Sequence, residues 1–378
     1  MHCMTHYLVK DKKIMDYYGN DGNKYTILDR FDHGGEGDLH NVQGHPKLAA
    51  KIYHADKRGG RRGRWAKVES WTKMASTIGD TFLDQVVIPR VALYDSPSMD
   101  LNSFAGYLME KLSSFATLDK IYEENSIDYT KKVWIARNLC ILTKQIHLNG
   151  NVVGDYNPNN VAVFTHNGTA KFIDTDSFQL VVTWNGVDRL CPCTVGVEHY
   201  LAPEIQNRLR AERANLETVN QSISNPLFNE YTDRYAMAYH IFALLMNGTA
   251  PYAGMIDMQE LAKHKSHTVS DVDINALEAS RRGEFLFCKN VLFKKIPEYA
   301  PKYQILSPKL QKLFERAFVD GATDPKARPD ESEFYNALME YYNSLEQCEC
   351  GRDHYLSSVY NGKCEWCRID EILKALAQ

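Results

Sequence analysis

The pattern of apolar residues changes once along this chain, close to Leu112, and this change limits the folds that the chain can adopt. Before it, the short β-prone runs YTILDRF, KLAAKIY and AGYLMEKL are separated by glycine-rich or polar stretches, with one probable helix, WAKVESWTKM. After it, apolar residues recur at helical spacing. A sheet-rich part followed by a helix-rich part indicates an α+β protein.

Two segments of the second part are predicted helices in different environments. In KKVWIARNLCILTKQIHLNG, four apolar residues spaced four, three and four positions apart form one stripe: Ile135, Leu139, Leu142 and Ile146. Gly150 supplies a stop signal. The segment 235–246, YAMAYHIFALLM, is apolar almost all round, which is typical of a helix buried on every side.

Two hairpins are predicted between these helices. The first joins VAVF and TAKFI at Asn167-Gly168, and the second turns at Asn185-Gly186. Acidic and amide side chains lie at the ends of the strands, where loops can present them to a ligand: Asp155, Asn160, Asp174 and Asp176.

Length and composition narrow the classes of protein. A chain of 378 residues usually forms two compact units or one two-lobed unit with an appendage. Its net charge of −4 argues against a general nucleic-acid binder. No apolar run approaches eighteen residues and charged residues occur early, so we expect neither a membrane span nor a signal peptide. Nine cysteines are too few for a disulfide scaffold in a chain this long, which favours a reducing, cytoplasmic location.

Four of the cysteines cluster near the C-terminus as C-x-C followed by C-x-x-C: Cys348, Cys350, Cys364 and Cys367. Four thiolates at this spacing suit a tetrahedral, structural Zn²⁺ site, and His354 could replace one thiolate. A module of some thirty residues has too little core to fold alone, so metal would stabilise it. Four unrelated free cysteines are the alternative.

The order of the motifs GGEG, AKIYH, GDYNPNN, IDTDSFQ and YLAPE resembles the eukaryotic-like protein kinase superfamily, in a divergent bacterial branch, over residues 25–345. The resemblance implies a bilobal kinase-like α+β fold with a C-terminal zinc ribbon. We therefore expect a lead-in over 1–24, a kinase N-lobe over 25–112, a C-lobe over 113–345 and a zinc-ribbon-like tail over 346–378. It also implies a protein substrate and, as possible partners, a metal-dependent phosphatase and a von Willebrand-type domain protein.

The resemblance assigns nucleotide-binding residues in the first part of the chain. Glycines would let the loop approach the phosphates, Lys51 would hold the α- and β-phosphates, and Glu69 would pair with Lys51. Met109 would be the gatekeeper beside the adenine. The remaining candidates are the loop glycines Gly34, Gly35 and Gly37 and the adenine-binding backbone of Glu110 and Leu112.

The second part carries the expected catalytic residues. By resemblance, Asp155 accepts or orients the proton of the substrate hydroxyl, while Asn160 and Asp174 bind Mg²⁺ beside ATP, with Asp176 in support. Mg²⁺ prefers such hard oxygen ligands. For the fold, Glu204 should pair with Arg328, and Asp233 should brace the backbone of the catalytic loop. Carboxylates that merely cap turns in a solvated loop are the alternative.

Two departures from the family pattern leave other functions open. Val153-Gly154 replaces the usual His-Arg, so a phosphorylated activation segment would lack its anchor, and we expect activity independent of such phosphorylation. Asn157 replaces the lysine that steadies the transferred phosphate. The leading hypothesis is a serine/threonine protein kinase using ATP and Mg²⁺. A pseudokinase scaffold and a kinase of a small molecule are the alternatives.

A basic run also stands out, with six positive charges between Lys57 and Lys67. Such runs are most often solvated loops, and a docking surface for an acidic partner is the alternative.

Overall fold

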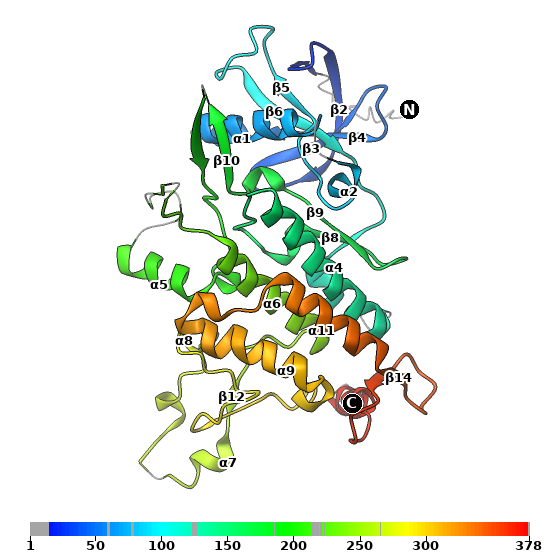
Figure 1. Cartoon of the computed structure of the whole chain (residues 1–378), viewed down its shortest axis with the longest axis vertical. Helices are drawn as coiled ribbons and strands as arrows, with labels where there is room; N and C mark the ends of the chain where they lie inside the picture. The colour runs from blue at the N-terminus through cyan, green and yellow to red at the C-terminus, as the bar shows by residue number, and fades with distance from the viewer. Residues whose placement is uncertain are drawn as a thin grey trace, which may run out of the picture. The chain divides into compact units, whose positions relative to one another are not determined.

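The computed structural model describes residues 15–376, except 59–60, 77–78, 123–126, 185, 214–215, 217–218, 220, 223 and 265. The chain divides into two compact units (Figure 1). The first unit comprises Met1–Leu83 and Val87–Ser113, and the second comprises Asp84–Val86 and Ser114–Gln378. The break after Ser113 lies one residue from the division expected at Leu112, and the cysteine-rich tail groups with the second unit.

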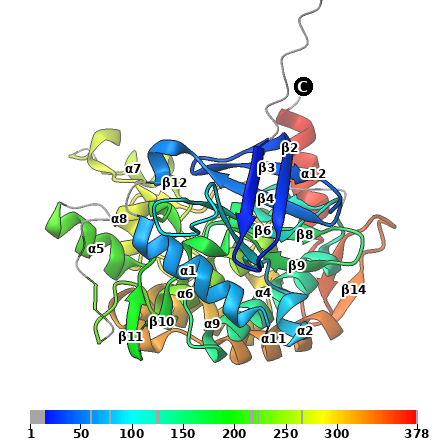
Figure 2. The same ribbon diagram turned by 90° about the horizontal axis from the view of Figure 1, so that it is seen from above.

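Six strands of the first unit close into a barrel in the order β1-β2-β3-β4-β6-β5. Figure 2 shows β2 and β3 side by side. The strands are β1 (Met15–Gly19), β2 (Lys24–His33), β3 (Gly37–Val42), β4 (Leu48–Tyr53), β5 (Val91–Tyr94) and β6 (Phe104–Glu110). The stretch expected as a lead-in therefore contains a strand, β1, which its polar sequence conceals because only Tyr17 and Gly19 are buried in it.

The barrel has one apolar cluster inside and another outside. The inner cluster takes residues from all six strands, namely Tyr17, Tyr25, Ile27, Val42, Ala50, Leu93, Ala105 and Leu108. The outer cluster is rich in aromatic rings and is covered by α1 (Arg61–Met74), whose Val68 and Trp65 pack into it. A short helix, α2 (Asp80–Leu83), follows. Because side chains alternate along a strand, Ala50 points inward and Lys51 lies on the side of the outer cluster.

The second unit is built mainly of helices. Its helices are α3 (Leu118–Tyr122), α4 (Tyr129–Leu148), α5 (Pro203–Glu212), α6 (Glu230–Leu245), α7 (Met258–Leu261), α8 (Ala276–Arg281), α9 (Pro308–Glu315), α10 (Gly321–Thr323), α11 (Glu331–Asn343) and α12 (Glu365–Leu376). In Figure 1, α4 lies against α6 and α11. The stripe predicted on α4 is fully buried, and so is α6 from Tyr235 onward, which confirms both helix predictions.

The strands of the second unit form small sheets. They are β7 (Ala116–Thr117), β8 (Val161–Phe164), β9 (Thr169–Phe172), β10 (Leu180–Trp184), β11 (Val187–Cys191), β12 (Met255–Ile256), β13 (Lys294–Lys295), β14 (Leu345–Gln347) and β15 (Tyr355–Ser357). Both predicted hairpins are present, as β8–β9 and β10–β11, and β7 extends the first into a three-stranded sheet. Gly168 has φ +71°, as the Asn-Gly turn requires.

The basic run of the first unit is largely used within that unit. Arg58 pairs with Asp95 at 3.2 Å, and Arg64 pairs with Glu36 at 2.5 Å. Lys67 is buried. The side chains of Arg61 and Arg62 lie outside the described part. Among the described residues, no helix has both the length and the apolar character needed to cross a membrane.

Candidate active site

The loop that carries Asp155 rests on α6 at two points. One turn into this helix, the carboxylate of Asp233 accepts the backbone N–H groups of Val153 (2.7 Å) and Gly154 (2.9 Å). Two turns later, Nε2 of His240 lies 2.7 Å from the carbonyl oxygen of Tyr156. The predicted bracing role of Asp233 therefore has the expected geometry.

His240 is neutral, because complete burial lowers its pKa to about 4. A neutral ring that faces a carbonyl must donate from Nε2, so Nδ1 accepts the hydroxyl of Tyr122, 2.6 Å away. This tautomer holds the loop through a directed bond. This role was not predicted from the sequence, because His240 lies inside an apolar run.

Asp155 and Asn160 are directly bonded within the loop. The amide nitrogen of Asn160 donates to Oδ2 of Asp155 at 3.2 Å and to its backbone oxygen at 3.1 Å. Asn157 donates to the same Oδ2 at 3.0 Å. Burial raises the pKa of Asp155, and these hydrogen bonds oppose the rise. Since the nitrogen of Asn160 is used in this way, its Oδ1 is the atom left for another ligand.

Asn157 stands where the family pattern has a lysine, and it has a local function. Its Oδ1 accepts the backbone N–H of Asn159 at 2.9 Å, while its nitrogen holds Asp155. The side chain is buried. It therefore shapes the loop rather than reaching toward a substrate.

The β8–β9 ladder brings Asp174 to the same end of the sheet as Asn160. The last ladder pair is Val161 with Phe172, and the backbone N–H of Ile173 donates to the carbonyl oxygen of Asn160 at 2.9 Å. Asp174 follows directly, with φ +60° and ψ +37°. Non-glycine residues adopt this left-handed conformation only when the surrounding structure imposes it, and such residues cluster at functional sites.

His147 at the end of α4 links α6 to α11. Its two ring nitrogens lie 3.0 Å from Asp233 and 2.9 Å from Glu331. Burial alone would lower the pKa of His147, but the two carboxylates outweigh it and raise the pKa to about 9. Burial would raise the pKa of Glu331, but the hydrogen bond and charge of His147 lower it to about 2. The sequence placed His147 beside the buried stripe of α4 but could not identify its partners.

The predicted pair between Glu204 and Arg328 is present. The two guanidinium NH₂ groups of Arg328 donate to the two carboxylate oxygens at 2.7 and 2.6 Å. The Arg328 side chain is fully buried, and that of Glu204 is 32% exposed. Arg328 also donates to the carbonyl oxygens of Gly321 and Tyr231. The pair therefore ties α5 to the region before α11.

The residue that replaces the family arginine, Gly154, packs against the segment that follows β11. It has φ +73°, and a Cβ added there would lie 2.7 Å from Cβ of Cys193. Cys193 is completely buried. The backbone of Val197 in the same segment lowers the pKa of Asp155. The loop and the segment thus meet through direct packing at the place where an arginine would otherwise project.

In the first unit, the predicted glycine loop is the turn between β2 and β3. The N–H of Gly34 donates to the carbonyl oxygen of Gly37 at 3.0 Å, and Gly35 lies in the turn between them. A Cβ on Gly37 would lie 2.6 Å from the carbonyl oxygen of Ile52 on β4, so only glycine fits there. Gly35 meets no such limit, since nothing lies within 4 Å of a Cβ added to it.

Lys51 projects from the middle of β4 into aromatic surroundings. It is 5% exposed, and its Nζ lies 5.7 Å and 5.9 Å from the ring centroids of Tyr53 and Tyr107. Glu69, the predicted partner of Lys51, lies on α1, and its carboxylate accepts the hydroxyl of Tyr94 and the amide of Asn20. The helix was predicted correctly, but its orientation places Glu69 against β5.

The expected adenine-binding residues lie at the end of β6. Met109 is opposite Ala49 and packs on the outer cluster, while Glu110 is opposite Leu48. Leu112 follows just after the strand. The N–H of Lys111, between them, donates to the carbonyl oxygen of Lys47 at 2.9 Å.

The four tail cysteines and His354 converge. The sulfurs of Cys348, Cys364 and Cys367 lie within 4.8 Å of one another, and so do the ligand atoms of Cys350, His354 and Cys367. The β14–β15 hairpin carries Cys348, Cys350 and His354, while Cys364 and Cys367 lie at the start of α12. Burial and then the neighbouring thiols raise the pKa of Cys367 to about 12. Several thiols this close together can bind a metal ion such as Zn²⁺, which coordinates cysteine as the thiolate.

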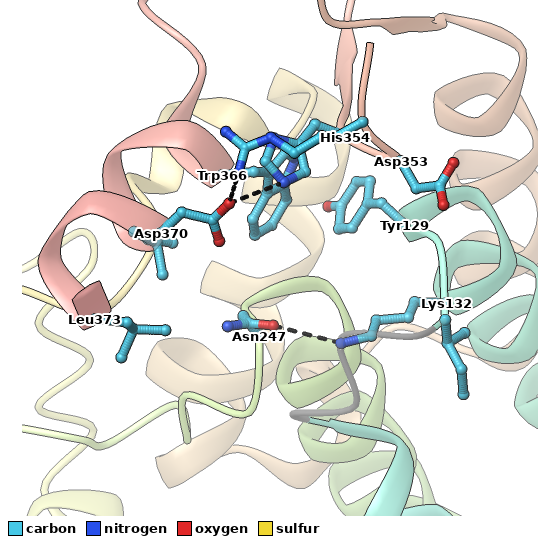
Figure 3. Close-up of a pocket in the computed structure, with 11 residues that line it drawn as sticks. Tyr129, Lys132, Asn247, Asp353, His354, Trp366, Asp370 and Leu373 are labelled. Atoms are coloured by element: carbon cyan, nitrogen blue, oxygen red, sulfur yellow. Dashed lines mark hydrogen bonds and ion pairs between the residues drawn. The ribbon is translucent and has the colours of Figure 1, made fainter. Parts of the chain in front are cut away.

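The cysteine module, residues 345–376, is docked on the helices of the second unit. The rings of Trp366 and Tyr129 have centroids 4.6 Å apart. A pocket of about 300 Å³ lies at this junction (Figure 3). In it, Asp370 faces His354, and Nζ of Lys132 lies 3.4 Å from Oδ1 of Asn247. None of the predicted catalytic residues lines this pocket.

Comparison with known proteins points to kinases. No protein-family model matches the sequence. Two curated proteins named protein kinase YegI are similar to it. The protein from Escherichia coli O157:H7 is 26% identical over 348 residues, covering 89% of this chain and 48% of that protein. The protein from Escherichia coli K12 is 25% identical over 367 residues, covering 95% and 51%. The chain spans about half the length of the curated relatives it matches.

Proposed function

We propose that this chain is a protein kinase that transfers the γ-phosphoryl group of ATP to serine or threonine hydroxyls with the help of Mg²⁺. The observation that carries the proposal is the bonded pair of Asp155 and Asn160, on a loop anchored to α6, with Asp174 at the same end of the β8–β9 ladder. Relatives named as protein kinases support it.

In this proposal Asp155 orients the acceptor hydroxyl and takes its proton. The raised pKa of this carboxyl group makes it a better base than an exposed aspartate, and Asn157 and Asn160 fix its position. The donor set for a cation is Oδ1 of Asn160 with the carboxylate of Asp174, which are hard oxygen ligands of the kind Mg²⁺ prefers. When bound, Mg²⁺ would neutralise charge on the phosphates.

The first unit would supply the nucleotide contacts. The turn formed by Gly34, Gly35 and Gly37 would let the backbone approach the phosphates closely, and Lys51 offers a positive charge. Met109, Glu110 and Leu112 would contact the adenine. Glu69, whose carboxylate accepts the hydroxyl of Tyr94, would pair with Lys51.

We further propose that activity does not require phosphorylation between Ser177 and Glu204. In kinases that depend on it, an arginine beside the catalytic aspartate receives the phosphate. Here the packing of Gly154 against Cys193 occupies that place. The β10–β11 hairpin orders part of the segment without a phosphate.

A nucleotide-binding pseudokinase is the second candidate, and the position of Asn157 favours it. The amide of Asn157 holds Asp155 and carries no charge. The loop therefore has no lysine at this position to steady the transferred phosphate. Slow transfer is therefore expected even if the protein is an active enzyme.

The test is transfer of label from [γ-³²P]ATP to the protein itself and to a general protein acceptor. The wild type should incorporate label, and Asp155→Asn and Asp174→Ala should not. Asp188→Asn, on the exposed β11 strand, is a matched control that should retain transfer. Equal labelling in the wild type and Asp174→Ala would refute the proposal, and no labelling despite nucleotide binding would favour the pseudokinase.

We also propose that the tail holds one structural Zn²⁺. The ligands would be Cys348, Cys364 and Cys367 with either Cys350 or His354, since four-coordinate zinc leaves one of the five donors over.

A further inference from the structure

Two histidines and an aspartate gather beside the glycine turn of the first unit, and the proposed function does not use them. His33 ends β2, Asp38 is the second residue of β3, and His54 follows β4. Nδ1 of His33 lies 2.6 Å, and Nε2 of His54 lies 3.3 Å, from the same Oδ1 of Asp38. All three ligand atoms lie within 4.8 Å of one another.

The sheet itself sets this arrangement. In the ladders His33 is opposite Asp38, and Asp38 is opposite Ile52. His54 lies two residues beyond Ile52, and residues two apart point to the same side of an extended chain. The two imidazole rings also stack, with centroids 5.3 Å apart. The cluster is therefore built from three neighbouring strands rather than from one flexible segment.

The two carboxylate oxygens of Asp38 have different partners: the histidines lie at Oδ1, and an arginine lies at Oδ2. Nη1 of Arg30 approaches the other oxygen, Oδ2, at 3.5 Å. Arg64, the other cation near the turn, is paired with Glu36. Among the described side chains, the imidazole nitrogens of His33 and His54 contact Oδ1 of Asp38, and a neutral imidazole is a metal ligand as well as a hydrogen-bond partner.

We propose that His33, Asp38 and His54 bind a divalent transition-metal ion, with zinc as the best match. Two nitrogens and one carboxylate oxygen with open positions for water form a common zinc ligand set. Metal–ligand bonds of roughly 2.0–2.1 Å place tetrahedral donor atoms about 3.3 Å apart. The spacing of His54 and Asp38 already matches, and His33 needs a small rotation away from Asp38. Its side chain is 64% exposed, so room for this rotation exists.

A bound ion would join the ends of three strands around the glycine turn. The turn lies between His33 and Asp38, so both of its ends would be fixed to one point, and His54 would tie that point to β4. Metal binding at this site would therefore stiffen the turn. This inference does not depend on kinase activity.

The test counts zinc per chain by elemental analysis after dialysis of the full chain against a zinc buffer of fixed free concentration. The wild type should hold one zinc more than the His33→Ala/His54→Ala variant. His45→Ala, an exposed histidine on the neighbouring turn, should match the wild type. The cysteine module is unchanged in all three proteins, so its own zinc cancels in the comparison.

A second variant guards against misfolding. Asp38→Asn keeps the size of the side chain and should weaken binding of the extra zinc by more than about tenfold. Equal zinc content in the wild type and the double variant, at every free zinc concentration up to saturation of the wild type, would overturn the proposal. So would an unchanged affinity in Asp38→Asn.

Discussion

Gly154 and Cys193 are in such close contact that a Cβ on Gly154 would lie 2.7 Å from Cβ of Cys193. The same glycine donates its N–H to Asp233 on α6. The loop that carries Asp155 is therefore held from both sides, by the buried helix and by the segment after β11. This double support holds the loop of Asp155 in place without an arginine beside the aspartate.

We predict that Gly154→Ala destabilises the protein more than Gly150→Ala. Both glycines have positive φ, and each alanine should cost about 1–2 kcal/mol for this conformation. Nothing lies within 4 Å of a Cβ on Gly150, whereas overpacking against Cys193 should add about 1–3 kcal/mol. The free energies of unfolding of the two variants, measured in urea, give both costs. Adding Cys193→Gly to Gly154→Ala should recover part of the loss, and equal costs for the two alanines would contradict the packing.

Arg328→Ala should be among the most destabilising single substitutions, costing about 3–5 kcal/mol because a buried charge pair loses one partner. Glu204→Ala should cost less, since Glu204 is partly exposed, yet it leaves Arg328 buried without its counter-ion. Arg210→Ala, which breaks the exposed pair with Glu278, should cost less than about 1 kcal/mol. Chemical denaturation that ranked Arg210→Ala equal to Arg328→Ala would count against this role.

The buried group around His147 should give stability a defined pH window. The pKa of His147 rises from 6.5 to about 9, so its contribution is complete below pH 6.5 and is lost as the pH rises toward 9. The pKa of Glu331 falls from 4.5 to about 2, so its contribution is complete above pH 4.5 and is lost as the pH falls toward 2.

Unfolding midpoints in urea, measured from pH 4 to pH 9, check this window. His147→Gln should lower stability at pH 6 and flatten the decline between pH 6.5 and 9. His166→Gln, on the exposed turn between β8 and β9, should leave the decline unchanged. A decline of the same slope in His147→Gln and the wild type would exclude His147 as its source.

Removing the tail metal should loosen the cysteine module while leaving most of the second unit folded. Zinc would hold the hairpin and α12 together, because the module has little core of its own. Cys364→Ser should lower the zinc content by one per chain, and either this variant or a chelator should expose residues 345–376 to protease. Cys288→Ser, an exposed cysteine outside the cluster, should do neither. Tail protection that survived metal removal would show that docking through Trp366 suffices.

Local patterns revealed the elements of this fold better than its long-range partners. The spacing of Asp155 and Asn160 is local, and a tight hairpin then brings Asp174 to the same end of the sheet. By contrast, β1 was missed because its sequence is polar, and β5 because it has only four residues.

Partners from distant parts of the chain were harder to find. The contact of Glu69 with Tyr94 depends on how α1 is rotated against the barrel, which residue spacing alone does not define. The bonds of His147 and His240 join helices or loops some 84 to 184 positions apart, and no pattern within one segment encodes them. The Glu204–Arg328 pair was found only because a family resemblance supplied it.

The most direct measurement of the central claim is the change in melting temperature caused by ATP, with and without Mg²⁺. A ligand present at about 100 times its Kd adds roughly 2.7 kcal/mol of stability. We predict a rise that requires Mg²⁺, is lost in Asn160→Ala and Asp174→Ala, and remains in Asn159→Ala, the exposed neighbour in the same loop. A rise of equal size without Mg²⁺, or one that persists in both Asn160→Ala and Asp174→Ala, would contradict a metal-dependent nucleotide site at these residues.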